Sequence, residues 1–146
     1  MSRATRLIET LELARHPEGG WYRETWRGPP GADGRAVGTV ILFLLEADQE
    51  SHWHKVDASE AWLWHEGDPL LLRLSASDAG PVREILLGGE LLEGGAMQAV
   101  VVPNEWQAAR PAGDGDHGYT LVSCVVAPGF DFAGFTLAEP DWRPGA

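Results

Sequence analysis

The chain has 146 residues, of which 44% are hydrophobic and 23% charged, a balance typical of one globular domain. Its formal net charge is -11 and its 11 Lys and Arg residues are scattered, which argues against a nucleic-acid partner and against binding to an anionic membrane. Cys124 is the only cysteine, so an intramolecular disulfide is excluded, and we expect it to be a buried core residue. The first fifteen residues lack the apolar core of a signal peptide, so we expect a cytoplasmic protein.

One helix is predicted, near the N-terminus. Leu7, Ile8 and Leu11 form an apolar stripe within residues 5–14, and the turn HPEGG at 16–20 ends the helix because proline and paired glycines disfavour it. The remaining chain alternates short extended runs with turns rich in Gly, Asp and Pro. The predicted strands cover 21–27, 39–45, 52–54, 60–65, 70–74, 83–87, 97–102, 119–126 and 134–137. This pattern predicts an all-β sandwich or barrel with a short N-terminal helix, forming a single domain over residues 1–146.

The stretch SHWHKVDASEAWLWHEGD, residues 51–68, carries the candidate site. Alternate residues of a strand point to the same side, so His52 and His54 are expected to project together. If the next strand is their neighbour, Glu60 converges on the two imidazoles. Two imidazoles and a carboxylate suit Fe, Mn, Ni or Zn and leave room for a substrate. The alternative is that no metal binds, and that these polar groups hydrogen-bond one another and water.

Trp62 and Trp64 share the Glu60 face of the predicted strand and are expected to line the barrel interior. They either fill the core or form an aromatic wall onto which a ligand stacks. Arg23 is a candidate for gripping a phosphate or carboxylate, with an ion pair as the alternative. Tyr119 is a candidate hydrogen-bond partner for a ligand, with an ordinary strand tyrosine as the alternative. The other histidines, His16, His65 and His117, are expected to be structural or solvated.

The spacing of the candidate ligands resembles the first motif of the cupins, a superfamily with a double-stranded β-helix (jelly-roll) barrel. The match covers His52-x-His54, then five intervening residues and Glu60, then six intervening residues and Gly67, although the family usually has one residue fewer before the glutamate. VVPNEWQAAR (101–110) resembles the second cupin motif, with Gln107 in the position of a metal-ligating histidine.

Further segments, HPEGGWYRETWR (16–27) and PGFDFAGFTLAE (128–139), are similar to one small cupin family related in fold to sugar-nucleotide epimerases of the RmlC type. The resemblance implies the cupin barrel and a homodimer. It also implies that a divalent metal, if one is bound, is held by His52, His54, Glu60 and Gln107.

Two main functions follow. The first is an enzyme that binds a small polar molecule, carbohydrate-like or linked to a nucleotide, and performs isomerase- or epimerase-type chemistry. A bound metal would polarise a carbonyl oxygen, and without metal His52 or His54 would act as the catalytic base. The second is a non-catalytic protein that binds a small ligand in the barrel. A structural or storage protein is a third possibility, which a solid barrel interior would favour.

Overall fold

The computed structural model describes residues 1–113 and 115–146. The first half of the chain forms α1 (Arg3–Thr10), β1 (Ala14–Arg15), β2 (Trp21–Arg27), β3 (Thr39–Glu46), β4 (Ser51–Val56), β5 (Ser59–Gly67) and β6 (Leu70–Ser75). The second half forms β7 (Val82–Leu87), η1 (Leu91–Glu93), β8 (Gln98–Val101), β9 (Trp106–Pro111), β10 (Tyr119–Ala127), η2 (Phe132–Gly134) and β11 (Phe135–Leu137), where η marks a 3-10 turn.

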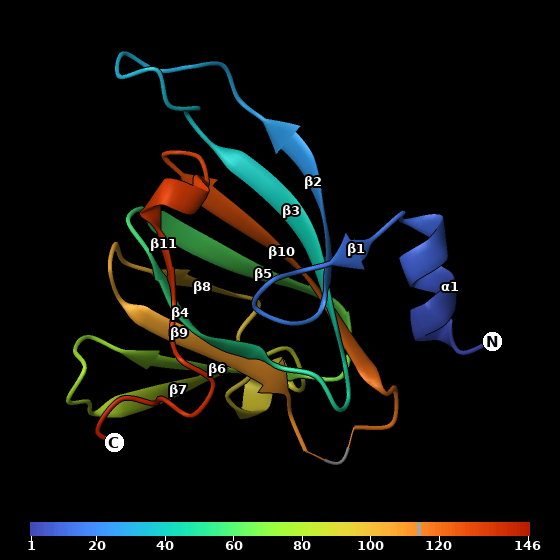
Figure 1. Cartoon of the computed structure of the whole chain (residues 1–146). Coiled ribbons are helices and arrows are strands. Elements are labelled where there is room, and N and C mark those ends of the chain that lie inside the picture. The colour runs from blue at the N-terminus through green and yellow to red at the C-terminus, as the bar shows by residue number, and fades with distance from the viewer. Residues whose placement is uncertain (114) are drawn as a thin grey trace.

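Two antiparallel sheets face each other across the core (Figure 1). One sheet has the strand order β1-β2-β3-β10-β5-β8, and the other has the order β11-β4-β9-β6-β7. The inward side chains of both sheets form one apolar core, which includes Phe43, Trp62, Leu72, Val122 and the predicted buried cysteine, Cys124. The predicted all-β jelly-roll barrel is confirmed.

The N-terminal helix is confirmed, but it begins and ends earlier than predicted. The hydroxyl of Ser2 accepts a hydrogen bond from the backbone N–H of Thr5 and so caps the first turn. Leu7, Ile8 and Leu11 pack against the outer surface of the six-stranded sheet, where they contact a cluster that includes Leu44 and Tyr119. Figure 1 shows α1 lying outside the barrel, away from its interior. Among the described residues, no helix is long and apolar enough to cross a membrane.

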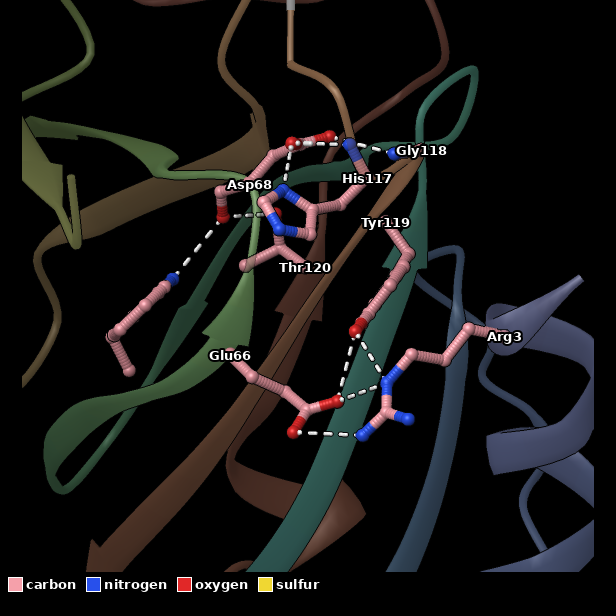
Figure 2. Close-up of polar contacts among 8 residues, drawn as sticks. Arg3, Glu66, Asp68, His117, Gly118, Tyr119 and Thr120 are labelled. Atoms are coloured by element: carbon pink, nitrogen blue, oxygen red, sulfur yellow. Dashed lines mark hydrogen bonds and ion pairs between the residues drawn. The ribbon is translucent and has the colours of Figure 1, made fainter.

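The connection after β5 is fixed by the carboxylate of Asp68 (Figure 2). This carboxylate accepts hydrogen bonds from the backbone N–H of His117 at 2.9 Å, from its ring Nδ1 at 3.0 Å and from the backbone N–H of Gly118 at 2.9 Å. The hydroxyl of Thr120 donates to the backbone carbonyl of Asp68 at 2.8 Å. Asp68 therefore ties the end of β5 to the beginning of β10, two strands that are neighbours in the sheet.

We predict that Asp68→Ala lowers the free energy of unfolding by about 2–3 kcal/mol, because it removes the buried, charged acceptor of three hydrogen bonds. Chemical denaturation measures the change. Asp116→Ala, at an exposed position in the same loop, is the matched control and should change stability little. Equal losses in the two variants would contradict the role given to Asp68.

Candidate functional site

The barrel contains a cavity of about 680 Å³ between its two sheets. Its polar wall includes four buried or nearly buried titratable side chains that we call the buried polar cluster: His16, Glu18, His54 and Glu60. Its apolar wall includes Tyr22, Ile41, Val56, Val126, Phe130 and Phe132. A hollow of this size, with a few convergent polar groups, is typical of a site for a small molecule.

A β-bulge in β4 decides which residues of that strand reach the cavity. Ser51 lies opposite Ala109 of β9 and His54 lies opposite Gln107, so three steps along β4 match two steps along its partner. The extra residue places both Ser51 and His54 on the inner side, where both are buried. The simple alternation assumed from the sequence does not hold across this bulge.

His52 consequently lies outside the main cavity. Its Nε2 is 2.8 Å from the backbone carbonyl of Glu139, to which it donates, and its ring lines a separate groove beside Pro17 and Leu137. His54 lines the main cavity with only 2% of its surface exposed. The prediction that the two imidazoles project together is wrong, and the physical reason is the bulge.

The turn HPEGG supplies two members of the buried polar cluster. Gly19 and Gly20 have φ angles of 109° and 82°, and a Cβ at Gly19 would overlap the carbonyl oxygen of Glu50. Gly20 therefore lets the turn pack against Leu44 and Leu45 of β3, and Gly19 lets it pack closely against the start of β4. There the Glu18 carboxyl accepts a hydrogen bond from the hydroxyl of Ser51 at 2.8 Å.

Sequence reasoning missed Glu18 and treated His16 as structural or solvated, yet both line the cavity. The signal that could have found them was the turn itself. A charged residue directly before two glycines, inside a segment that resembles the family, indicates a polar side chain placed by a close backbone approach. The His16 ring also has structural contacts: its Nδ1 accepts a hydrogen bond from the backbone N–H of Glu18 at 3.1 Å, and the ring packs against Tyr22 and Phe43.

His54 and Glu18 must share a proton. The Nδ1 of His54 donates to the backbone carbonyl of His52 at 2.8 Å, since a carbonyl can only accept. A neutral His54 therefore presents an unprotonated Nε2, which lies 3.2 Å from Oε2 of Glu18. Burial raises the pKa of Glu18 and lowers the pKa of His54, which favours a neutral pair with the proton on the carboxyl.

Glu60, on β5, is the second carboxyl of the cluster. Burial raises its pKa, His54 and a hydrogen bond from Gln107 lower it, and the nearby Glu18 raises it, so that the pKa of Glu60 is about 7. This side chain is 7% exposed and lines the same cavity as His54, as the sequence predicted for the two. Glu60 can therefore exchange a proton near neutral pH.

The residues predicted to bind a metal do not form a metal site. His52 points into the separate groove, and both polar atoms of the Gln107 amide are occupied: Oε1 accepts from Nε1 of Trp62 at 2.8 Å, and Nε2 donates to Glu60 at 2.9 Å. Across residues 1–113 and 115–146, no group of three or more His, Cys, Asp and Glu side chains is placed to hold an ion. The residues present do not fit the predicted metal, and metal binding is not confirmed.

The predicted ligand-binding tryptophans and tyrosine do not line the cavity. Trp62 is 1% exposed and belongs to the core, and Trp64 donates its Nε1–H to the backbone carbonyl of Asp68 at 3.1 Å. Tyr119 is buried beneath the helix, where its hydroxyl donates to Glu66 at 2.8 Å (Figure 2). Arg3 completes that contact by donating to the same carboxylate at 3.0 Å. This arrangement supports a structural role for Tyr119 instead of ligand binding.

Arg23 is the predicted ligand-binding residue that does line the cavity. Its guanidinium donates to the exposed carboxylate of Glu12 at 3.3 Å, a contact that is weak in water. Arg27 lines the cavity as well and forms a two-bonded pair with Glu24, at 2.8 and 2.9 Å. Both arginines are partly exposed residues of the cavity wall.

Comparisons with known proteins agree with this fold. A model of the Cupin superfamily (DUF985) matches residues 5–138. The uncharacterized protein YML079W of Saccharomyces cerevisiae is 28% identical over 152 residues, covering 92% of this chain and 74% of the yeast protein. The solved structure of a protein from Shewanella oneidensis is 34% identical with a TM-score of 0.86, covering 95% of this chain and 86% of that one.

A hypothetical protein from Leishmania major is similar over 94% of this chain and 88% of its own, at 32% identity and a TM-score of 0.82. These matches confirm the predicted cupin barrel. They do not show the finer relation to the RmlC-type epimerases, which stays a prediction.

We predict that Glu60→Gln changes how stability depends on pH. The folded protein holds the Glu60 proton more tightly than the unfolded chain does, so ionising this carboxyl costs stability as pH rises from 4.5 to about 7. The free energy of unfolding of Glu60→Gln, relative to that of wild type, should therefore rise by roughly 3 kcal/mol between pH 4.5 and pH 8, at about 1.4 kcal/mol per pKa unit.

Urea unfolding across this pH range measures the difference. Glu93→Gln, at an exposed position of η1, removes the same charge and should leave the pH profile parallel to that of wild type. A Glu60→Gln profile that is also parallel to wild type would show that Glu60 titrates alike in the folded and unfolded states.

Proposed function

This chain belongs to the Cupin superfamily (DUF985), and on that premise we propose that its cavity binds a small carbohydrate-like molecule and transfers a proton next to a carbonyl group, as isomerases and epimerases do. The observation that carries the proposal is that Glu60 and the Glu18–His54 pair reach one cavity of about 680 Å³. The proposal covers the reaction type and substrate class, and the metal prediction plays no part in it.

The two parts of the cluster suit the two halves of such a reaction. Ionised Glu60 takes the proton from the carbon next to the carbonyl, and the electrons of the broken C–H bond move onto the carbonyl oxygen. The proton held between Glu18 and His54 stabilises or neutralises that oxygen. Protonated Glu60 gives an isomer when it returns its proton to the neighbouring carbon, whose hydroxyl proton passes back to the Glu18–His54 pair. An epimer forms when the Glu18–His54 pair instead donates a proton to the opposite face of the same carbon, after which solvent carries the proton on Glu60 back to the pair. A carboxyl whose pKa lies near 7 is well matched to this exchange at neutral pH.

The composition of the cavity wall supports a ligand with polar and apolar parts. The buried carboxyls favour hydroxyl groups that donate hydrogen bonds, while Tyr22 and Phe130 offer ring faces against which a sugar or base packs. Arg23 and Arg27 supply positive charge for a phosphate or carboxylate at the other end of the ligand. A phosphorylated sugar or a sugar nucleotide combines these features.

The test is deuterium exchange. Wild-type protein is incubated in D₂O with a panel of sugar phosphates and sugar nucleotides, and NMR follows loss of the proton next to each carbonyl. We expect exchange for at least one member, lowered about 100-fold or more by Glu60→Gln and by His54→Gln. His52→Gln is the matched control and should retain exchange, because His52 lies outside the main cavity.

Exchange that survives in Glu60→Gln, or that is lost in His52→Gln, would contradict the proposed roles. A different result is that calorimetry detects saturable binding of a panel member while no panel member exchanges its proton. That result would favour the alternative, a non-catalytic protein that holds a small ligand in the same cavity.

We also propose that the protein is a homodimer, as the resemblance to the family implies. β8 is an edge strand of the six-stranded sheet, and it and the residue after it carry exposed apolar side chains, with Val100 60% and Val102 57% exposed. Light scattering coupled to size exclusion should give about twice the chain mass of 15.9 kDa. A mass near that of a single chain would contradict the proposal.

A further inference from the structure

We infer that Gln107 is a positioning residue for Glu60. Trp62 fixes the orientation of the Gln107 amide, and the amide in turn holds Oε1 of Glu60 on the core side. The other carboxyl oxygen of Glu60 is left to face the cavity. A role of this contact in catalysis rests on the proposed function. The hydrogen bond between Gln107 and Glu60 and its effect on the protonation of Glu60 do not rest on that function, and separate experiments test them.

The orientation of the amide follows from the chemistry of its neighbour. The indole nitrogen of Trp62 carries a hydrogen and can only donate, so the atom of Gln107 that faces it at 2.8 Å must be the oxygen. The NH₂ group of the amide is then directed at Glu60, to which it donates at 2.9 Å. A flipped amide would direct its NH₂ group at the indole N–H of Trp62, so that two donors face each other. It would also direct its oxygen at the Glu60 carboxylate, so that two acceptors face each other once Glu60 is ionised. With Gln107 and Trp62 each only 1% exposed, water cannot relieve either mismatch.

The three side chains come from two strands, which makes their geometry stiff. Glu60 and Trp62 are two residues apart on β5, so they project from the same face of that strand. Gln107 reaches them from β9 in the facing sheet, where its backbone is paired with that of Leu74 in β6. Because regular strands hold all three residues, the orientation of the Glu60 carboxyl is set before any ligand enters.

Every structural element packed around Glu60 contributes to its protonation. His54 faces it from β4, Glu18 from the turn before β2, Cys124 from β10 and Gln107 from β9. Glu18 disfavours the ionised carboxylate, and the other three favour it. Gln107 is the neighbour whose donor is fixed by a further buried side chain. Its hydrogen bond therefore favours the ionised form of Glu60, which is buried beside a second carboxyl.

The test replaces the amide with a carboxyl of the same shape. In Gln107→Glu, one oxygen still accepts from Trp62, but the other oxygen faces Glu60 and forces the two carboxyls to share a proton. The pH titration of the Glu60 side-chain carbon, followed by ¹³C NMR, should move upward by at least about one pH unit, a roughly ten-fold gain in proton affinity. Gln98→Glu, on the exposed side of β8, introduces the same charge and should leave the Glu60 midpoint unchanged.

An unchanged Glu60 midpoint in Gln107→Glu would overturn the inference. If Gln107→Glu fails to fold, a titration of the wild-type protein tests the inference instead. The side-chain N–H resonances of Gln107 should shift with the same midpoint as Glu60, and amide protons that do not respond to Glu60 ionisation would overturn the inference equally. The titrations can give the expected shifts while no substrate exchanges its proton for deuterium. That outcome would support Gln107 as a positioning residue and would contradict only the proposed function.

Discussion

The burial of two carboxyls next to two imidazoles, those of His16 and His54, is the constraint on which the site depends. Glu18 and Glu60 both lie in the barrel with little access to water, and both have a raised pKa because the ionised form is poorly solvated there. His54 can offset only part of that cost, since burial lowers its own pKa. The cluster therefore keeps protons that exposed carboxyls would lose, and those protons are what the cavity can offer to a ligand.

Two backbone irregularities create this cluster. The bulge in β4 rotates His52 out of the cavity and brings Ser51 to the inner side, where it holds Glu18. Gly19, directly after Glu18, lets the turn approach the start of β4 closely enough for that contact. In the amide of Gln107, the same barrel has a donor for Glu60 at the position where the family motif has a metal ligand. This arrangement supports the proposed transfer of a proton by the protein's own side chains.

The sequence predicted the fold and part of the site. Strand-length apolar runs and turn residues predicted an all-β sandwich or barrel. The resemblance of residues 51–68 and 101–110 to cupin motifs specified the barrel and led to His54, Glu60 and Gln107, which do meet in the interior. The direction of His52 was beyond reach, because a bulge breaks the alternation that the prediction assumed and leaves no local sequence signal. Glu18 was missed for a different reason: a residue in a turn has no periodicity that shows where it points.

The interpretation of the cavity as a proton-transfer site is tested most directly by measuring the protonation of Glu60 in the ligand-free wild-type protein. Selective ¹³C labelling of glutamate and NMR titration between pH 4 and pH 9 would follow this carboxyl, with Glu60→Gln used to assign its signal. We expect a midpoint near 7, as burial beside Glu18 requires. A midpoint at the ordinary glutamate value of about 4.5 would contradict this interpretation, because Glu60 would then be permanently ionised at neutral pH and too weak a base for the proposed reaction.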